Sequence, residues 1–307
     1  MERLSLSQLR PDVRNKEIVV RVIQKWKRVS QKEPIQLYGM KMILLDEEEQ
    51  LIQASIYKTL VSKYDKEIKE GHVYKFSKFK TGPNYGIEKV TTHPCRLFIE
   101  FSSKVEQHRE LPIPLYAFRF TTFDDIIHGN VISDQYFDVI GEFSEYYNIV
   151  ESKEGYRRTK IDLIDAENQK MTCAVWNTYC DDITNIVTNY AKAEERPILI
   201  IQCVTINYYE GDVSIQTSRG RTKFYVNLEI HEVAEFKARR SVARADAEGS
   251  LRLTGATSDE NGELPSCKLK SLQEIKTCDK AGEFITVVTI IELDSNVLWY
   301  YNLCTAC

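Results

Sequence analysis

The chain has 307 residues, of which 43% are hydrophobic and 28% charged, with 13 glycines and 8 prolines. This globular composition excludes wholesale disorder, collagen and low-complexity structure, and at about 150 residues per domain the length allows two domains and a fragment. The formal net charge of −4 argues against a strongly basic nucleic-acid-binding protein.

The charge is unevenly distributed along the chain. Residues 1–110 contain 21 Lys and Arg against 15 Asp and Glu, whereas residues 111–236 contain 11 against 20. The first third can therefore attract a polyanion that the middle third should repel. We expect no membrane association, because the longest uncharged apolar stretch, 197–209, is too short to span a bilayer and the N-terminus has no apolar signal segment.

The first part of the chain predicts three strands, a helix and two more strands. β-Branched and aromatic residues mark the strands, and the helix has Leu60, Val61, Tyr64 and Ile68 on one side before Gly71. The strands fall at residues 17–26, 37–47, 51–57, 72–80 and 95–101, and the helix falls at 59–71.

The same order returns in the second part of the chain. Strands are predicted at 136–143, 157–167, 170–176, 197–209 and 212–218, with a helix at 177–195. A shift of 119 residues aligns Val20 with Val139, Leu44 with Leu163, Asp46 with Asp165, Ala54 with Cys173, Ile56 with Val175 and Tyr57 with Trp176. We therefore predict two copies of one domain.

Five strands with a helix between the third and the fourth are the order of an OB-fold, a small Greek-key barrel. The chain is thus predicted to be all-β, with OB-folds at 1–110 and 137–236. Residues 111–136 are predicted to be a linker with little structure beyond one helical turn. Residues 237–265 are predicted to be a second linker, helical at its start and mobile further on, and 266–307 begin a third unit.

Two pairs of aromatic residues are candidates for stacking on nucleic-acid bases. Tyr57 and Trp176 end the third strand of each copy, on the face opposite to the alternating apolar residues. Tyr85 and Tyr209 lie in the hairpins between the fourth and fifth strands. Core or turn positions are the alternative for all four.

Basic residues near the first-to-second strand loops are candidates for phosphate contacts. They are Lys27 and Arg28 in the first copy, and Arg157 and Arg158 in the second, with Lys58 following Tyr57. Trp26, inside the first basic cluster, is expected to be exposed and is itself a candidate for nucleic-acid contact. A solvated, charged loop is the alternative.

No catalytic or cofactor motif is present, so we expect no enzymatic activity and no cofactor. Cys304 and Cys307 form a C-x-x-C pair that could supply half of a zinc site, with zinc binding only if a second ligand pair were present. Incidental thiols are the alternative, and most of the other cysteines are expected to be buried as small apolar residues.

The sequence resembles the large subunit of replication protein A, and more narrowly its plant-type and transposon-associated forms. The resemblance is carried by LSQLRPDVRNKEIVVRVIQKWK, LLDEEEQLIQASIYK, YFDVIGEFSE, IDLIDAENQKMTCAVWN and residues 268–307. It implies two tandem OB-folds that bind single-stranded DNA and a third OB-fold with an inserted zinc ribbon.

The resemblance also assigns residues and partners. Tyr57 and Trp176 match the family's third-strand stacking aromatics, Tyr209 matches a hairpin stacking aromatic, and Cys304 and Cys307 match the first half of the zinc ribbon. It implies a nuclear role in DNA replication, repair and recombination, with the smaller replication protein A subunits as candidate partners.

Three departures from the family bear on function. The family's N-terminal protein-interaction OB-fold is missing, and the third unit ends after one cysteine pair, which puts zinc binding and subunit assembly in doubt. Gln202, Thr205 and Asp212 stand where relatives often have basic residues, so we expect weak binding by the second copy. The alternative is an OB-fold that binds proteins, or a truncated or transposon-derived copy that has lost DNA affinity.

Overall fold

The computed structural model describes residues 1–30, 35–85, 90–109, 111–131, 135–193, 195–209, 211–253, 268–269 and 284–285. Two compact units are present, Met1–Ala243 and Arg244–Cys307. Beyond residue 253 the described elements are β15 (Lys268–Leu269) and β16 (Phe284–Ile285), which pair in parallel. The rest of the predicted third unit, 266–307, lies outside the described residues, and so does the Cys304–Cys307 pair.

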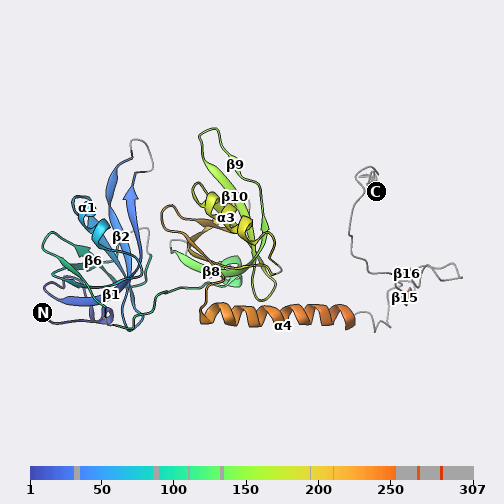
Figure 1. The fold of residues 1–307 in the computed structure, drawn as a ribbon, viewed down its shortest axis with the longest axis horizontal. Helices are drawn as coiled ribbons and strands as arrows, with labels where there is room; N and C mark the ends of the chain where they lie inside the picture. The colour runs from blue at the N-terminus through green and yellow to red at the C-terminus, as the bar shows by residue number, and fades with distance from the viewer. Residues whose placement is uncertain are drawn as a thin grey trace. The chain divides into compact units, whose positions relative to one another are not determined.

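The first barrel is built from one curled sheet (Figure 1). Its elements are η1 (Leu6–Gln8), β1 (Glu17–Val29), β2 (Leu37–Leu45), β3 (Leu51–Tyr57), α1 (Lys58–Glu67), β4 (Val73–Ser77), β5 (Lys80–Pro83), β6 (Cys95–Ile99) and β7 (Lys104–Gln107). A bend at Lys78, which has φ +56°, joins β4 to β5. Because β4 pairs with β1 and β5 pairs with β6, this bent segment closes the barrel.

The second barrel repeats this design. Its elements are β8 (Phe137–Tyr146), β9 (Val150–Glu151), β10 (Arg157–Ile164), β11 (Lys170–Trp176), α3 (Tyr179–Tyr190), β12 (Ile198–Tyr209), β13 (Asp212–Thr217) and β14 (Lys223–Val226). Cys203, with φ +59°, bends β12 as Lys78 bends the first barrel. β12 then pairs with β8 before the bend and with β13 after it, and β13 lies parallel to β11.

The predicted tandem OB-fold is confirmed, with a helix between the third and fourth strands in both copies. The predicted register of the repeat also matches the packing. Val20, Leu44, Ala54 and Ile56 are at most 2% exposed in the first core, and Val139, Leu163, Cys173 and Val175 are fully buried in the second. The two copies therefore fill equivalent core positions with apolar side chains of their own.

The hairpin after the second strand has the same hydrogen bonds in both copies. Asp46 Oδ1 accepts hydrogen bonds from the backbone N–H groups of Glu48 (3.1 Å) and Gln50 (2.9 Å). Asp165 Oδ1 does the same for Glu167 (2.9 Å) and Gln169 (2.7 Å). Both carboxylates are buried beneath the turn. The backbone N–H groups of the turn supply the hydrogen bonds that a buried carboxylate needs.

Asp46→Ala is expected to lower the free energy of unfolding by roughly 2–4 kcal/mol, more than Asp165→Ala, at about 1–2 kcal/mol. Asp46 Oδ2 also accepts from the buried backbone N–H of Leu6 (2.7 Å), which would be left without a partner. Urea denaturation followed by circular dichroism measures both changes. A larger loss from Asp165→Ala would contradict this assignment.

Side chains of the first predicted linker, 111–136, pack more closely than a free linker would. Tyr116, Phe118 and Phe120 form a row of stacked rings, with centroid distances of 5.9 and 5.2 Å, and Phe118 meets Tyr225 of β14 edge-on at 5.4 Å. The expected helical turn is α2 (Phe123–Ile127), whose Phe123 and Ile126 are buried in the second core. The described part of 111–136 thus has one helical turn and otherwise little regular structure, as predicted, but its aromatic and apolar side chains pack onto the second barrel.

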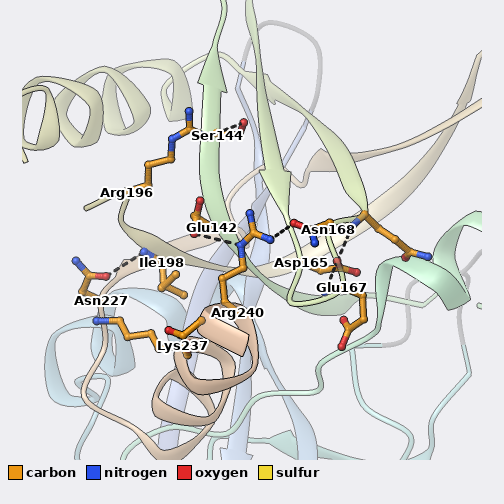
Figure 2. A network of polar contacts seen from close by, with 12 residues as sticks. Glu142, Ser144, Asp165, Glu167, Asn168, Arg196, Ile198, Asn227, Lys237 and Arg240 are labelled. Carbon is orange, nitrogen blue, oxygen red and sulfur yellow. Dashed lines mark hydrogen bonds and ion pairs between the residues drawn. The ribbon is translucent and has the colours of Figure 1, made fainter. Parts of the chain in front are cut away.

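The second predicted linker, 237–265, was expected to start as a helix. That helix is α4 (His231–Leu253), which begins before residue 237, inside the predicted second OB-fold. Val233 and Phe236 pack against Ile198 and Ile200 of the second barrel. Arg240 reaches from the helix to Glu142 (Nε–Oε2 3.3 Å) and to Asn168 (Figure 2). Because Arg240 and Glu142 are both buried, α4 is anchored to the barrel.

Four of the eight cysteines lie in the described part, and all four are buried free thiols: Cys95, Cys173, Cys180 and Cys203. Burial raises the pKa of each, which makes these thiols unreactive. No helix in the described ranges has the length and apolar character needed to cross a membrane. The described residues also contain no group of three or more His, Cys, Asp or Glu side chains arranged to hold a metal.

Candidate functional site

The first barrel has a cleft of about 270 Å³ on its outer face. Three cations and three aromatic residues line it: Arg28, Lys41, Arg96, Tyr38, Tyr57 and Phe98. Strand register brings them together, because Arg28 pairs with Gly39 and Gly39 pairs with Tyr57. Ser55, two residues before Tyr57, pairs with Phe98 of β6.

The two arginines in this cleft lie against its rings. The Arg28 guanidinium carbon lies 5.9 Å from the Tyr38 ring centroid, and that of Arg96 lies 5.0 Å from the Phe98 ring centroid. Among the described residues, neither Arg28 nor Arg96 forms an ion pair with a carboxylate. The cleft therefore offers uncompensated positive charge beside flat apolar surfaces.

Tyr57 depends on a glycine in the neighbouring strand. Its side chain is 58% exposed, at the point where β3 ends and α1 begins. Gly39 lies opposite with φ +155°, and a Cβ there would approach the Ile56 carbonyl oxygen to 2.6 Å. Glycine thus allows β2 and β3 to come close and leaves the Tyr57 ring without a cross-strand side chain over it.

The second barrel has a larger cleft, of about 940 Å³, around Trp176. Tyr156, Tyr179 and Arg219 contribute to its lining. Arg158 pairs with Trp176 across β10 and β11, and its guanidinium carbon lies 5.5 Å from the Trp176 ring centroid. Arg158 occupies the position that Gly39 has in the first copy, so Trp176 is half-buried where Tyr57 is open.

Several predicted cations already have acidic partners. Lys27 and Lys25 both contact Asp65 of α1, at 2.7 and 3.0 Å, and their hydrogen bonds lower the pKa of that carboxyl. Arg157 makes a two-pronged contact with Asp181 of α3, at 2.8 and 3.0 Å. Lys27 and Arg157 therefore have less free charge to offer a phosphate than Arg28.

Trp26 was expected to be exposed, and this is wrong. It lies on the same face of β1 as Arg28, but it is only 6% exposed because Arg221 of the second barrel covers its ring. Gln202 is likewise buried, where its amide donates to the Ala117 carbonyl oxygen (3.2 Å). The lack of a basic residue at position 202 is therefore no reason to expect weak binding by the second copy, because this side chain is buried.

The hairpin aromatics are strongly exposed. Tyr85 is 75% exposed, beside residues outside the described ranges, and Tyr209 is 66% exposed. Tyr208, next to it, is 58% exposed, and alternation along β12 directs the two rings to opposite faces. Lys58 is also exposed, at the start of α1.

Four charged or aromatic residues of the first cleft were not predicted from the sequence: Tyr38, Lys41, Arg96 and Phe98. A signal existed in the strand CRLFI, where buried Cys95, Leu97 and Ile99 alternate with Arg96 and Phe98. An arginine and a phenylalanine on the outward face of one strand indicate a cation and a ring side by side. Tyr38, at the start of β2, is 51% exposed, but buried and exposed residues do not alternate regularly along that strand. The sequence of β2 therefore gives no comparable signal.

Comparisons with known proteins support the fold. Residues 7–129 match a family described as domain of unknown function DUF223. No curated protein matches the chain. A solved structure described as a replication protein A heterotrimer bound to single-stranded DNA is similar at 18% identity and a TM-score of 0.54. The match covers 89% of this chain and 62% of that one.

Two further similar structures match less well. The solution structure of DNA-binding domain A of S. cerevisiae replication protein A is 21% identical, at a TM-score of 0.29, and the match covers 36% of this chain and 98% of that one. A p202 HIN1 domain in complex with double-stranded DNA is 10% identical, at a TM-score of 0.40, covering 73% and 100%. The tandem OB-fold architecture is thus shared with the replication protein A heterotrimer structure, of which this chain spans less than two thirds.

Proposed function

We propose that this chain binds single-stranded DNA with little sequence preference, in the manner of a replication protein A large subunit. The first cleft carries the proposal. Arg28 and Arg96 form no ion pair with a carboxylate in the part of the chain that the structure describes, and they lie against Tyr38 and Phe98, beside the open ring of Tyr57. Cations that capture phosphates and rings that stack on bases are what sequence-independent binding of a single strand requires.

The proposal extends to the biological setting. The protein would protect exposed single strands during replication, repair and recombination in the nucleus, without enzymatic activity and without a cofactor. The smaller replication protein A subunits are proposed partners. The likeness in fold to the replication protein A heterotrimer structure supports this setting.

Binding to a fluorescein-labelled dT oligonucleotide of about 24 nucleotides is expected to weaken steeply with salt, because each phosphate contact contributes roughly −0.7 to the slope of log K against log salt. Fluorescence anisotropy between low and high salt measures this slope. A duplex and an oligo-U of equal length are the controls for strand state and for sugar. Absence of salt-sensitive binding to all three would refute the proposal.

The acidic second barrel supports one alternative. Residues 111–236 have nine more acidic than basic residues, so this part of the chain could present its cleft to a basic peptide instead of a polyanion. In that case a labelled Lys- and Arg-rich peptide would bind and dT would compete poorly. The first cleft makes this the weaker proposal, because Arg28 and Arg96 lie against rings there and have no carboxylate partner among the described residues.

A further inference from the structure

The two barrels meet through a buried arginine that no part of the proposed function requires. Arg221 follows β13 of the second barrel, and its guanidinium carbon lies 5.6 Å from the ring centroid of Trp26 and 4.7 Å from that of Tyr136. Arg221 and Trp26 are 8% and 6% exposed. A cation enclosed between two rings and shielded from water is held more firmly than one at the surface.

Hydrogen bonds across the same contact join buried polar groups of the two barrels. The Gln24 side-chain amide of β1 donates to the Arg221 carbonyl oxygen, and the Cys203 thiol donates to Gln24 Oε1 (3.5 Å). Gln24 is 1% exposed. At the margin, Lys223 forms an ion pair with Glu70 (Nζ–Oε2 2.6 Å). Separating the barrels would break all of these bonds together, and water would have to replace the lost partners.

Apolar packing accompanies the polar contacts. Val19, Ile23 and Ile43 of the first barrel form one buried cluster with Ile113 of the linker and Cys203 of the second barrel. These side chains lie on the outer face of the first barrel, away from its own core. An apolar patch on the outside of a barrel is explained when another domain covers it.

The contact lies between the two clefts. Arg219 and Gly220 line the Trp176 cleft, while Arg221, the next residue, faces Trp26. On the other side, Arg28 lines the first cleft two residues after Trp26. Ile35, from the loop between β1 and β2 of the first barrel, also lines the cleft of the second. β1, which carries Trp26, therefore also carries a lining residue of the first cleft. The loop before β14, which carries Arg221, also carries lining residues of the second cleft.

We propose that the Trp26–Arg221 contact fixes the two barrels as one preassembled surface, along which a single nucleic-acid strand occupies both clefts. This rests on the proposed function. Barrels that are already aligned lose little orientational freedom when a strand binds the second cleft after the first. Arg221 is thus a positioning residue for long strands, without itself having to touch them.

Arg221→Ala in the full chain separates this role from direct binding. We expect its affinity for dT of about 24 nucleotides to fall about 10-fold, because the second binding step loses effective concentration, while that for dT of about 8 nucleotides changes less than about twofold. Lys223→Met, which removes only the marginal ion pair, should shift the same ratio by a smaller factor. Arg196→Ala removes an equal charge from an exposed site on the second barrel and should leave the ratio unchanged.

Hydrogen–deuterium exchange without nucleic acid provides an independent measurement. Amides around Trp26 and around Arg221 should exchange slowly in the parent and faster in Arg221→Ala, while those of β3 and β11 stay protected. Unchanged exchange, or an equal loss of affinity for both oligonucleotides, would overturn the inference. If the parent binds neither oligonucleotide, the proposed function fails, and the exchange experiment still decides whether the contact fixes the barrels.

Discussion

Replacing both Tyr57 and Trp176 by alanine is expected to weaken binding of a dT oligonucleotide at least about 30-fold, since each ring stacked on a base contributes about 1–3 kcal/mol. Tyr57→Ala should act through the open ring of the first cleft, which is 58% exposed. Trp176→Ala also releases Arg158, which rests on its ring. Anisotropy titrations at low salt, with circular dichroism to confirm folding, measure the loss.

Matched variants separate stacking from general apolar contact. Tyr57→Phe and Trp176→Phe keep a flat ring and should stay within a few-fold of the parent, whereas Tyr57→Leu and Trp176→Leu should not. Phe101→Ala removes a ring that is 90% exposed and lies outside both clefts, and it should have no effect. Parental affinity in the double alanine variant would rule out stacking at these positions.

The fold was predictable because the sequence patterns that indicate it are either local to one strand or helix, or repeated in both copies. Alternation in each strand and a helix between the third and fourth strands give the OB-fold order, and six aligned positions show that it occurs twice. The aligned aspartates show the limits of such a comparison, since both make the same turn but only Asp46 also caps the Leu6 N–H. The segment before the first strand is present in both copies, since the backbone N–H groups of Leu4 and Thr121 donate to the first strand of their own barrel at Glu17 and Asp138. The third contact is therefore a detail of the first copy that the repeat does not predict.

The site was predictable only in part, because exposure was inferred one barrel at a time. Alternation placed Tyr57 outward, and the structure agrees. The same alternation places Trp26 outward from its own barrel, yet the second barrel covers it through Arg221. Likewise, Lys27 and Arg157 stand in basic sequence contexts, but helices α1 and α3 supply Asp65 and Asp181 as partners. Such neighbours are set by tertiary packing, which strand patterns do not encode.

Arg28→Ala together with Arg96→Ala is expected to lower affinity about 25-fold at about 0.1 M salt and to reduce the magnitude of the salt slope by about 1.4, which are the values for two phosphate contacts on a single strand. Both guanidinium groups line the first cleft and have no carboxylate partner among the described residues. Titrations at several salt concentrations give both quantities from one series. A lysine pair at these positions should keep the slope but lose part of the affinity, since lysine restores charge without the planar contact to Tyr38 and Phe98.

Arg157→Ala is the control that tests the electrostatic argument itself. Net charge changes as it does for Arg28→Ala alone, but Arg157 is already compensated by Asp181 at 2.8 Å. If unpaired charge in the first cleft drives capture, Arg157→Ala should change affinity less than about twofold and leave the slope intact, because the freed aspartate stays screened at the surface. Equal losses from Arg157→Ala and Arg28→Ala would mean that overall charge drives binding. The uneven charge of the chain, basic in its first third and acidic in its middle, would then act as a long-range field and not through the cleft.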